Sequence, residues 1–155
     1  MSLESTHRDA ERPAHRQQSA VVDVRGPRFA AAVTTVVLAS VLLTGAWWLL
    51  AVQAVVFAVG AAFGPRRTPY GWFFSHVVAP RITPPAEREP VAPLRFAQTV
   101  GLVFAAVGVA GYAAGVPLLG ALATALALFA ALLNAAFGFC LGCRMYPMIA
   151  YLRMT

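Results

Sequence analysis

The chain has 155 residues, of which 59% are hydrophobic and 12% are charged, and its formal net charge is +6. An ordinary soluble domain has charged residues at roughly a quarter of its positions, so this composition excludes that class. All twelve basic residues are arginine, and a chain without lysine has no Schiff-base nucleophile. The arginines flank long apolar segments instead of gathering on one folded face, which argues against nucleic-acid binding. We therefore expect a single helical domain embedded in a lipid bilayer.

The N-terminal part of the chain changes from polar to apolar. Residues 1–21 carry scattered charges without apolar periodicity, so we expect a disordered arm there and no cleavable signal peptide. Residues 29–63 are apolar almost throughout. A bilayer core needs about 20 helical residues, so this segment is too long for one span. We predict two short helices, over 29–45 and 47–63, joined near Gly45.

The second half of the chain predicts another helical hairpin. A loop over 64–95 is rich in proline and arginine, and its aromatic cluster predicts a short surface helix that ends before Pro80. Two more spans follow at about 96–114 and 118–139, and a tail closes the chain at 147–155. The predicted fold is therefore an all-α integral membrane domain over 22–146. It has four transmembrane helices in two hairpins and a cytoplasmic interfacial segment.

The distribution of arginine predicts the orientation of these spans. Five arginines lie in residues 1–28, five in the 64–95 loop and two in residues 140–155, and none lies in the joints near Gly45 and Gly115. With four spans all twelve fall on one side of the membrane. The positive-inside rule then places both termini and the long loop in the cytoplasm of a bacterial inner membrane.

The two cysteines of the chain, Cys140 and Cys143, form a C-x-x-C motif where the last apolar segment ends. On a helix the two side chains lie about 60° apart, on one face. Three interpretations remain open: a reversible dithiol or sulfur carrier, half of a metal site to which His76 could contribute, and a pair of small packed residues. A permanent structural disulfide is not expected in a reducing compartment.

The reactivity of the motif depends on the helix that carries it. If the fourth span continues through the cysteines, the negative end of its dipole disfavours a thiolate. If Gly138 and Gly142 break the chain, a new helix begins near Cys140 and its N-terminus favours the thiolate. Arg144 is expected to favour the thiolate in either arrangement. The sequence leaves this choice open.

Three further residues are candidates for a supporting role. Asn134 is polar within the fourth span, and we expect it to bond a neighbouring helix or to line a substrate pocket; on a straight helix it would not share a face with the cysteines. Arg25 and Arg28 enter the first span, where they contact lipid headgroups or bind an anion. No metal or other cofactor is expected.

Four stretches of the chain are distinctive: RGPRF, FGPRRTPYGW, RFAQTVGL and LLNAAFGFCLGCRMY. Together, over residues 20–146, they resemble an uncharacterised bacterial family of four-pass membrane proteins known as a domain of unknown function. The resemblance maps the cysteine pair of the family onto Cys140 and Cys143. Many members have an acidic residue where this chain has Arg144. Family members look like genomic neighbours of thioredoxin-like and rhodanese-like sulfurtransferase proteins, which implies a role in thiol or sulfur metabolism.

These observations lead to a functional hypothesis and two alternatives. The hypothesis is a cytoplasm-facing membrane dithiol that exchanges electrons or sulfane sulfur with a soluble thioredoxin- or rhodanese-like partner. The first alternative is a non-catalytic membrane anchor or assembly subunit. The second is a transporter for a small sulfur compound, which is weakened because the predicted spans lack ionisable side chains. Whether the chain is an enzyme, and whether it forms oligomers, stay open.

Overall fold

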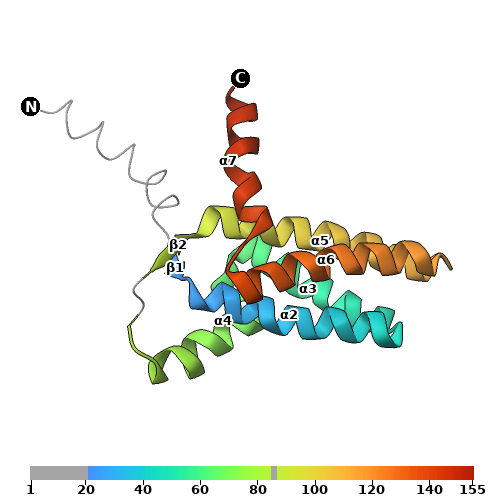
Figure 1. The fold of residues 1–155 in the computed structure, drawn as a ribbon, viewed down its shortest axis with the longest axis horizontal. Coiled ribbons are helices and arrows are strands. Elements are labelled where there is room, and N and C mark those ends of the chain that lie inside the picture. Colours follow the sequence, from blue (N-terminus) through green and yellow to red (C-terminus); the bar gives the residue numbers. More distant parts are fainter. Residues whose placement is uncertain (1–20, 85–86) are drawn as a thin grey trace, which may run out of the picture.

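The protein is a bundle of four long helices with a fifth helix projecting from one end (Figure 1). The computed structural model describes residues 21–84 and 87–155. The bundle helices are α2 (Arg25–Thr44), α3 (Trp47–Phe63), α5 (Val91–Ala113) and α6 (Pro117–Phe137). They form two antiparallel hairpins. The last helix, α7 (Leu141–Met154), leaves the bundle at a steep angle to its axis (Figure 1).

Both hairpin turns use local backbone chemistry to reverse the chain. Gly45 ends α2 in the left-handed region, with φ of 67°, and its N–H donates to the carbonyl of Val41 at 2.8 Å. Glycine adopts this conformation without a Cβ penalty. Pro117 occupies the first turn of α6, where its missing N–H costs no helical hydrogen bond. The two predicted joints, near Gly45 and Gly115, are therefore confirmed as turns.

Three of the four bundle helices have the length and apolarity of membrane spans. Helices α2, α5 and α6 are 20, 23 and 21 residues long and are apolar enough to cross a bilayer, and α3 is a shorter apolar helix of 17 residues. Many large apolar side chains on their outer faces are exposed, among them Leu43 at 87% and Val36 at 67%. In water such surfaces would be costly, so this is a membrane protein.

The helices pack through small residues. A Cβ atom at Gly108 of α5 would lie 2.7 Å from Leu50 of α3, so this leucine fills the space above the glycine. Ala105, Ala123 and Ala127 are buried in the same interior. Close backbone approach replaces the hydrophobic drive that lipid does not supply between helices.

The connection between α3 and α5 is mostly helical. After the 3₁₀ turn Pro65–Arg67 come α4 (Pro69–Phe73), a π-helical turn (Phe74–Val78) and a second 3₁₀ turn (Ala79–Arg81). The predicted short helix is therefore present, but it runs through Pro80 instead of ending before it. Proline is tolerated there because it occupies the first turn of the new 3₁₀ segment.

Two short strands were not predicted. β1 (Val21–Asp23) pairs antiparallel with β2 (Arg88–Pro90), and Val21 lies opposite Pro90. Val21 therefore belongs to a strand and not to the N-terminal arm. The rest of the predicted disordered arm, residues 1–20, lies outside the described part of the chain. The pairing fixes the start of α2 beside the start of α5, a long-range contact that local sequence patterns do not reveal.

The charged residues of the described part of the chain gather at one end of the bundle. Their segments are the starts of α2 and α5, the connection between α3 and α5, and α7, whereas the two hairpin turns at the opposite end hold none. Arg95 shows how these arginines are used. Its Nε and Nη2 donate to the carbonyl oxygens of Ala61 and Ala62, each at 2.8 Å. A cation thus compensates the negative C-terminus of α3.

Candidate dithiol site and the adjoining cavity

The fourth bundle helix ends immediately before the C-x-x-C motif. Helix α6 ends at Phe137, and Gly138 adopts φ of 65° while its N–H donates to the carbonyl of Asn134 at 3.0 Å. Only glycine takes this left-handed conformation without strain. The fourth helix therefore does not continue to residue 139 and does not carry the cysteines. Of the two arrangements that the sequence left open, the structure has the one with a new helix at the motif.

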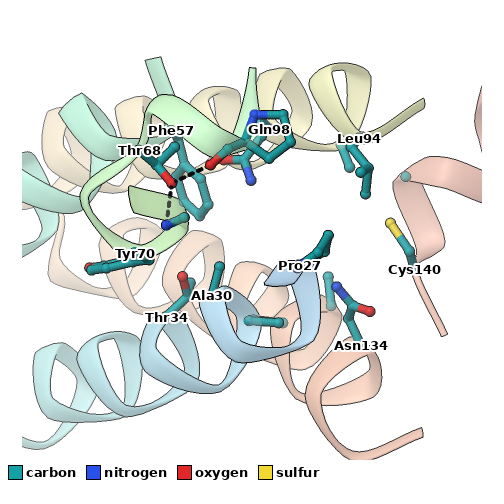
Figure 2. A pocket seen from close by; sticks show the side chains of 18 of the residues that line it. Pro27, Ala30, Thr34, Phe57, Thr68, Tyr70, Leu94, Gln98, Asn134 and Cys140 are labelled. Atoms are coloured by element: carbon teal, nitrogen blue, oxygen red, sulfur yellow. Dashed lines mark hydrogen bonds between the residues drawn. The ribbon is translucent and has the colours of Figure 1, made fainter. Parts of the chain in front are cut away.

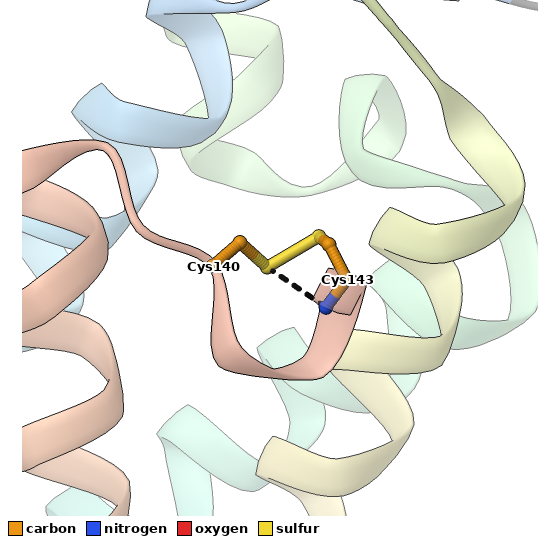
Figure 3. Close-up of a disulfide and its surroundings, with 2 residues drawn as sticks. All are labelled: Cys140 and Cys143. Carbon is orange, nitrogen blue, oxygen red and sulfur yellow. Dashed lines mark hydrogen bonds between the residues drawn. A yellow bond between two sulfur atoms is a disulfide. The ribbon is translucent and has the colours of Figure 1, made fainter. Parts of the chain in front are cut away.

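Cys140 is the N-cap residue of this new helix, α7. Its Sγ accepts a hydrogen bond from the backbone N–H of Cys143 at 3.2 Å, and a disulfide joins the two cysteines, whose Cα atoms are 5.2 Å apart (Figure 3). The first N–H groups of a helix have no partner within the helix and carry a partial positive charge. This position therefore stabilises a thiolate at Cys140 once the disulfide is reduced.

The first turn of α7 rests on α5. A Cβ atom at Gly142 would lie 2.7 Å from both the Cα and the Cβ atoms of Ala97, and the Phe96 and Tyr146 rings lie 6.0 Å apart. The C-terminal half of α7 projects away from the bundle (Figure 1). Pro147 lies inside α7 and does not interrupt it, because a proline there removes one hydrogen bond without ending the helix.

The three arginines singled out from the sequence lie in different surroundings. The Arg144 guanidinium lies over the Phe139 ring, 4.6 Å from its centroid, in a cation–π contact. The Nε of Arg28 is 3.6 Å from the position of a Cβ at Gly138, so Arg28 lies beside the turn that precedes the motif. Arg25 is engaged elsewhere.

Arg25 holds the connection between α3 and α5 in place. It forms a bidentate pair with the carboxylate of Asp23, at 2.9 Å for the shortest contact, and donates to the carbonyl of Thr83 at 2.8 Å. The hydrogen bond that the Arg25 side chain donates to the Asp23 carboxylate holds the pKa of Asp23 below its ordinary value, although burial opposes the effect. The structure thus brings Arg28 and Arg144 close to the motif and leaves Arg25 with the β1 strand.

A cavity of about 390 Å³ lies next to the motif, at the charged end of the bundle. Its volume is in the range of small-molecule sites. All four bundle helices, the connection between α3 and α5, and the start of α7 contribute to its wall. Its lining includes Asp23, Ala30, Thr34, Gln53, Arg66, Tyr70, Gln98, Leu126, Phe129, Asn134 and Cys140.

Asn134 and Cys140 line this cavity together. In Figure 2 the Asn134 amide and the Cys140 sulfur lie at one end of it, and Thr34 and Tyr70 lie toward the other. On a straight helix Asn134 would not share a face with the cysteines. The turn at Gly138 removes that restriction, because it redirects the chain. Asn134 thus lines a cavity, and its role toward a substrate stays a prediction. Ala127 and Ala131 of α6 line the cavity too, and Ala127 also belongs to the packed core of the bundle.

A row of hydrogen-bonded polar side chains at the other end of the cavity was not predicted. Gln53 is 1% exposed, its Oε1 accepts from the Tyr70 hydroxyl at 2.8 Å, and its Nε2 lies 3.5 Å from Thr34 Oγ1. Burial raises the pKa of Tyr70. Gln53 is an amide in an otherwise apolar span, and that was the available sequence signal. Only the fold shows that its hydrogen-bond donor, Tyr70, comes from α4.

The possible metal ligands are dispersed. Within residues 21–84 and 87–155, no three His, Cys, Asp or Glu side chains gather at one point. The His76 ring stacks on Trp72 with centroids 4.6 Å apart and is exposed, which is the position of an interfacial residue. The geometry of the motif thus offers two sulfur atoms, a helix N-terminus and a cavity, a combination suited to thiol exchange.

Comparison with protein families identifies the relatives of this chain. The model of DUF4395, described as a domain of unknown function, matches residues 22–150. The chain belongs to the DUF4395 family. The matched region includes the whole bundle, the cavity and the cysteine pair. Comparison with curated proteins and with solved structures gives no significant match.

Proposed function

We propose that this protein is a membrane-bound dithiol–disulfide exchanger, in which Cys140 and Cys143 exchange electrons with a soluble thioredoxin-like partner. The observation that carries the proposal is the position of Cys140 as N-cap of α7, with its sulfur bonded to the Cys143 N–H at 3.2 Å. Reactive C-x-x-C motifs need this relation to a helix N-terminus, since it favours the thiolate.

The proposed exchange has two steps that balance. A thiolate of the partner attacks Cys143, and Cys140 leaves as a thiolate, because the sulfur stabilised by the helix N-terminus is the better leaving group. The second thiol of the partner loses its proton and attacks the partner's own sulfur in the mixed disulfide. The bond to Cys143 breaks, and Cys143 leaves as a thiolate that takes up a proton. The products are the partner disulfide and two reduced cysteines, Cys140 and Cys143. Two electrons pass from the partner to the membrane protein.

The proposal includes an orientation in a bacterial inner membrane. We infer four spans, in which α3 crosses despite its 17 residues, because a short hydrophobic helix is accommodated by local thinning of the bilayer at modest cost. The end of the bundle that carries the charged residues then faces the cytoplasm, following the positive-inside rule. The motif lies at that end, within reach of a soluble cytoplasmic partner.

Reduction by thioredoxin tests the exchange directly. The oxidised protein, in phosphatidylcholine nanodiscs, is incubated with reduced thioredoxin and alkylated with a maleimide that adds mass to each thiol. We expect both Cys140 and Cys143 to be alkylated only after reduction. Cysteines that stay unmodified while dithiothreitol reduces them would show that the partner class is wrong, and cysteines resistant to both reductants would remove the function itself.

A monothiol thioredoxin identifies the attacked sulfur. This variant lacks its resolving cysteine, so its mixed disulfide with the membrane protein persists. Peptide mass mapping should place the link at Cys143. A link at Cys140 would keep the exchange and reverse the assigned roles.

The non-catalytic anchor makes the opposite genetic prediction. If the chain only anchors an assembly, a Cys140→Ala, Cys143→Ala double variant complements a gene deletion fully. We expect loss of complementation at normal expression, with a Met148→Ala variant of α7 as the matched control that keeps function. Full complementation by the double variant would contradict the exchanger.

A further inference from the structure

The cavity beside Cys140 is the part of the molecule that thiol exchange with a soluble partner leaves unexplained. We propose that it binds a lipid-soluble quinone, which accepts the electrons of the reduced cysteine pair. This inference rests on the proposed function, because it names the acceptor of the same dithiol. Cys140 lines the cavity, whereas Cys143 is not part of its wall, so one sulfur faces the acceptor.

The chemistry of the wall favours an uncharged ligand. Most of the lining is apolar, and the polar groups that Figure 2 shows around the void include the neutral side chains of Thr34, Gln98 and Asn134. Two charged residues, Asp23 and Arg66, line the cavity too, but the charge of Asp23 is paired with Arg25, and Arg66 is an exposed residue. Amide and hydroxyl groups fix the carbonyl oxygens of a neutral ring. An anion such as thiosulfate would lose its hydration among apolar side chains, at high cost.

The wall also reaches the outer face of the bundle. Leu126 and Phe129 of α6 line the cavity and are nevertheless 55% and 58% exposed. In the inferred four-span orientation, this outer face contacts lipid. A ligand dissolved in the bilayer can therefore enter the cavity from the lipid side and reach the sulfur of Cys140. Quinones are two-electron acceptors of this solubility.

The quinone accepts all the electrons and protons that the cysteine pair releases, so the step needs no other reactant. The thiols of Cys140 and Cys143 lose two electrons and two protons, and the sulfur–sulfur bond forms between them. The quinone gains both electrons and both protons and becomes a quinol. Exchange with the partner then reduces the disulfide again. The net reaction oxidises a soluble dithiol and reduces a membrane quinone.

A matched pair of α2 variants tests binding. Ala30 lines the cavity (Figure 2), whereas Ala32, two residues further along α2, is exposed and lies outside its wall. Protein in phosphatidylcholine nanodiscs is equilibrated with decylubiquinone, and the amount bound above that in empty nanodiscs is measured. We expect binding by the wild type and by Ala32→Phe, and binding at least about tenfold weaker, equivalent to about 1.4 kcal/mol, for Ala30→Phe. Equal binding by all three, or none above empty nanodiscs, overturns the site.

Oxidation is measured separately from binding. The reduced wild-type protein is mixed anaerobically with decylubiquinone, and both thiol loss and quinol formation are followed. We expect one quinol for each disulfide formed, no quinol from Cys140→Ser, and retained quinone binding by Cys140→Ser. A protein that exchanges with thioredoxin but yields no quinol refutes this inference and keeps the proposed function. A protein that binds quinone but exchanges with neither dithiothreitol nor thioredoxin refutes the proposed function.

Discussion

Gly142 of α7 lies against Ala97 of α5 so closely that a Cβ at position 142 would come within 2.7 Å of the Ala97 Cα and Cβ atoms. Real Cβ contacts are longer, and the nearest atoms include backbone, which cannot rotate away. The helix that carries the cysteines thus contacts the bundle at a point where a glycine of α7 faces an alanine of α5. This contact sets where the N-terminus of α7, and with it Cys140, stands relative to the cavity.

A larger residue at Gly142 should displace the start of α7. We expect Gly142→Val to lower stability by about 1–3 kcal/mol, the usual cost of overpacking, and to slow alkylation of the reduced Cys140. The measurement is thermal unfolding in detergent together with the rate of iodoacetamide alkylation. The double variant Gly142→Val, Ala97→Gly should recover part of both losses. An Ala150→Val control in the same helix should behave as wild type, and unchanged alkylation in Gly142→Val would contradict this account.

Loss of the buried Gln53 amide should destabilise the protein, because the Tyr70 hydroxyl bonds to it. Replacing it in Gln53→Leu leaves the Tyr70 hydroxyl, now bonded to Gln53 Oε1 at 2.8 Å, without an acceptor. We expect a loss of about 1–3 kcal/mol, the cost of an unsatisfied buried polar group. A double-mutant cycle with Tyr70→Phe, measured by unfolding in detergent, should give a coupling of about 0.5–3 kcal/mol. Additive effects would show that the two side chains do not interact.

The Asp23–Arg25 pair predicts an acid-sensitive anchor for the connection between α3 and α5. The Arg25 hydrogen bond lowers the pKa of Asp23 from its ordinary value of 3.8. A lowered folded-state pKa adds stability above the unfolded-state value, and that stability is lost as pH falls through the folded-state value. The thermal midpoint of Asp23→Asn should therefore lie below that of the wild type at neutral pH. The difference should start to shrink as the pH falls to about 3.8 and should vanish below the lowered folded-state pKa. A difference that is constant with pH would contradict the ionic origin.

Single cysteines in a Cys140→Ala, Cys143→Ala background test the number of spans. Thr44 and Val116 lie at the two hairpin turns, and Thr155 lies at the opposite, charged end. A membrane-impermeant maleimide should label Thr44→Cys and Val116→Cys in intact cells, and Thr155→Cys in inverted vesicles only. If α3 does not cross, the labels at Thr44→Cys and Val116→Cys fall on opposite sides. Labelling of Thr155→Cys in intact cells, without labelling of Thr44→Cys or Val116→Cys, would show the inverted orientation.

Much of the bundle could be predicted because its determinants are local. Apolar runs of fixed length, Gly45 between two of them and Pro117 at the start of another specify where helices begin and end. Helical hydrogen bonds lie within one segment, so composition and turn residues suffice to predict them. The β1–β2 pairing could not be predicted in this way, because each strand has three residues and its partner is far away in the sequence.

The sequence by itself determined a helical membrane protein whose arginines flank the apolar segments and are absent from the two hairpin turns. It also singled out Cys140 and Cys143 as the pair able to carry covalent chemistry. Only the tertiary structure decided that Gly138 turns the chain, that Cys140 caps a new helix and that Asn134 shares a cavity with it. The reason is physical: a backbone at Gly138 can be helical or left-handed at similar cost. The choice between them depends on where α7 finds room to pack, at Ala97 of a helix distant in the sequence.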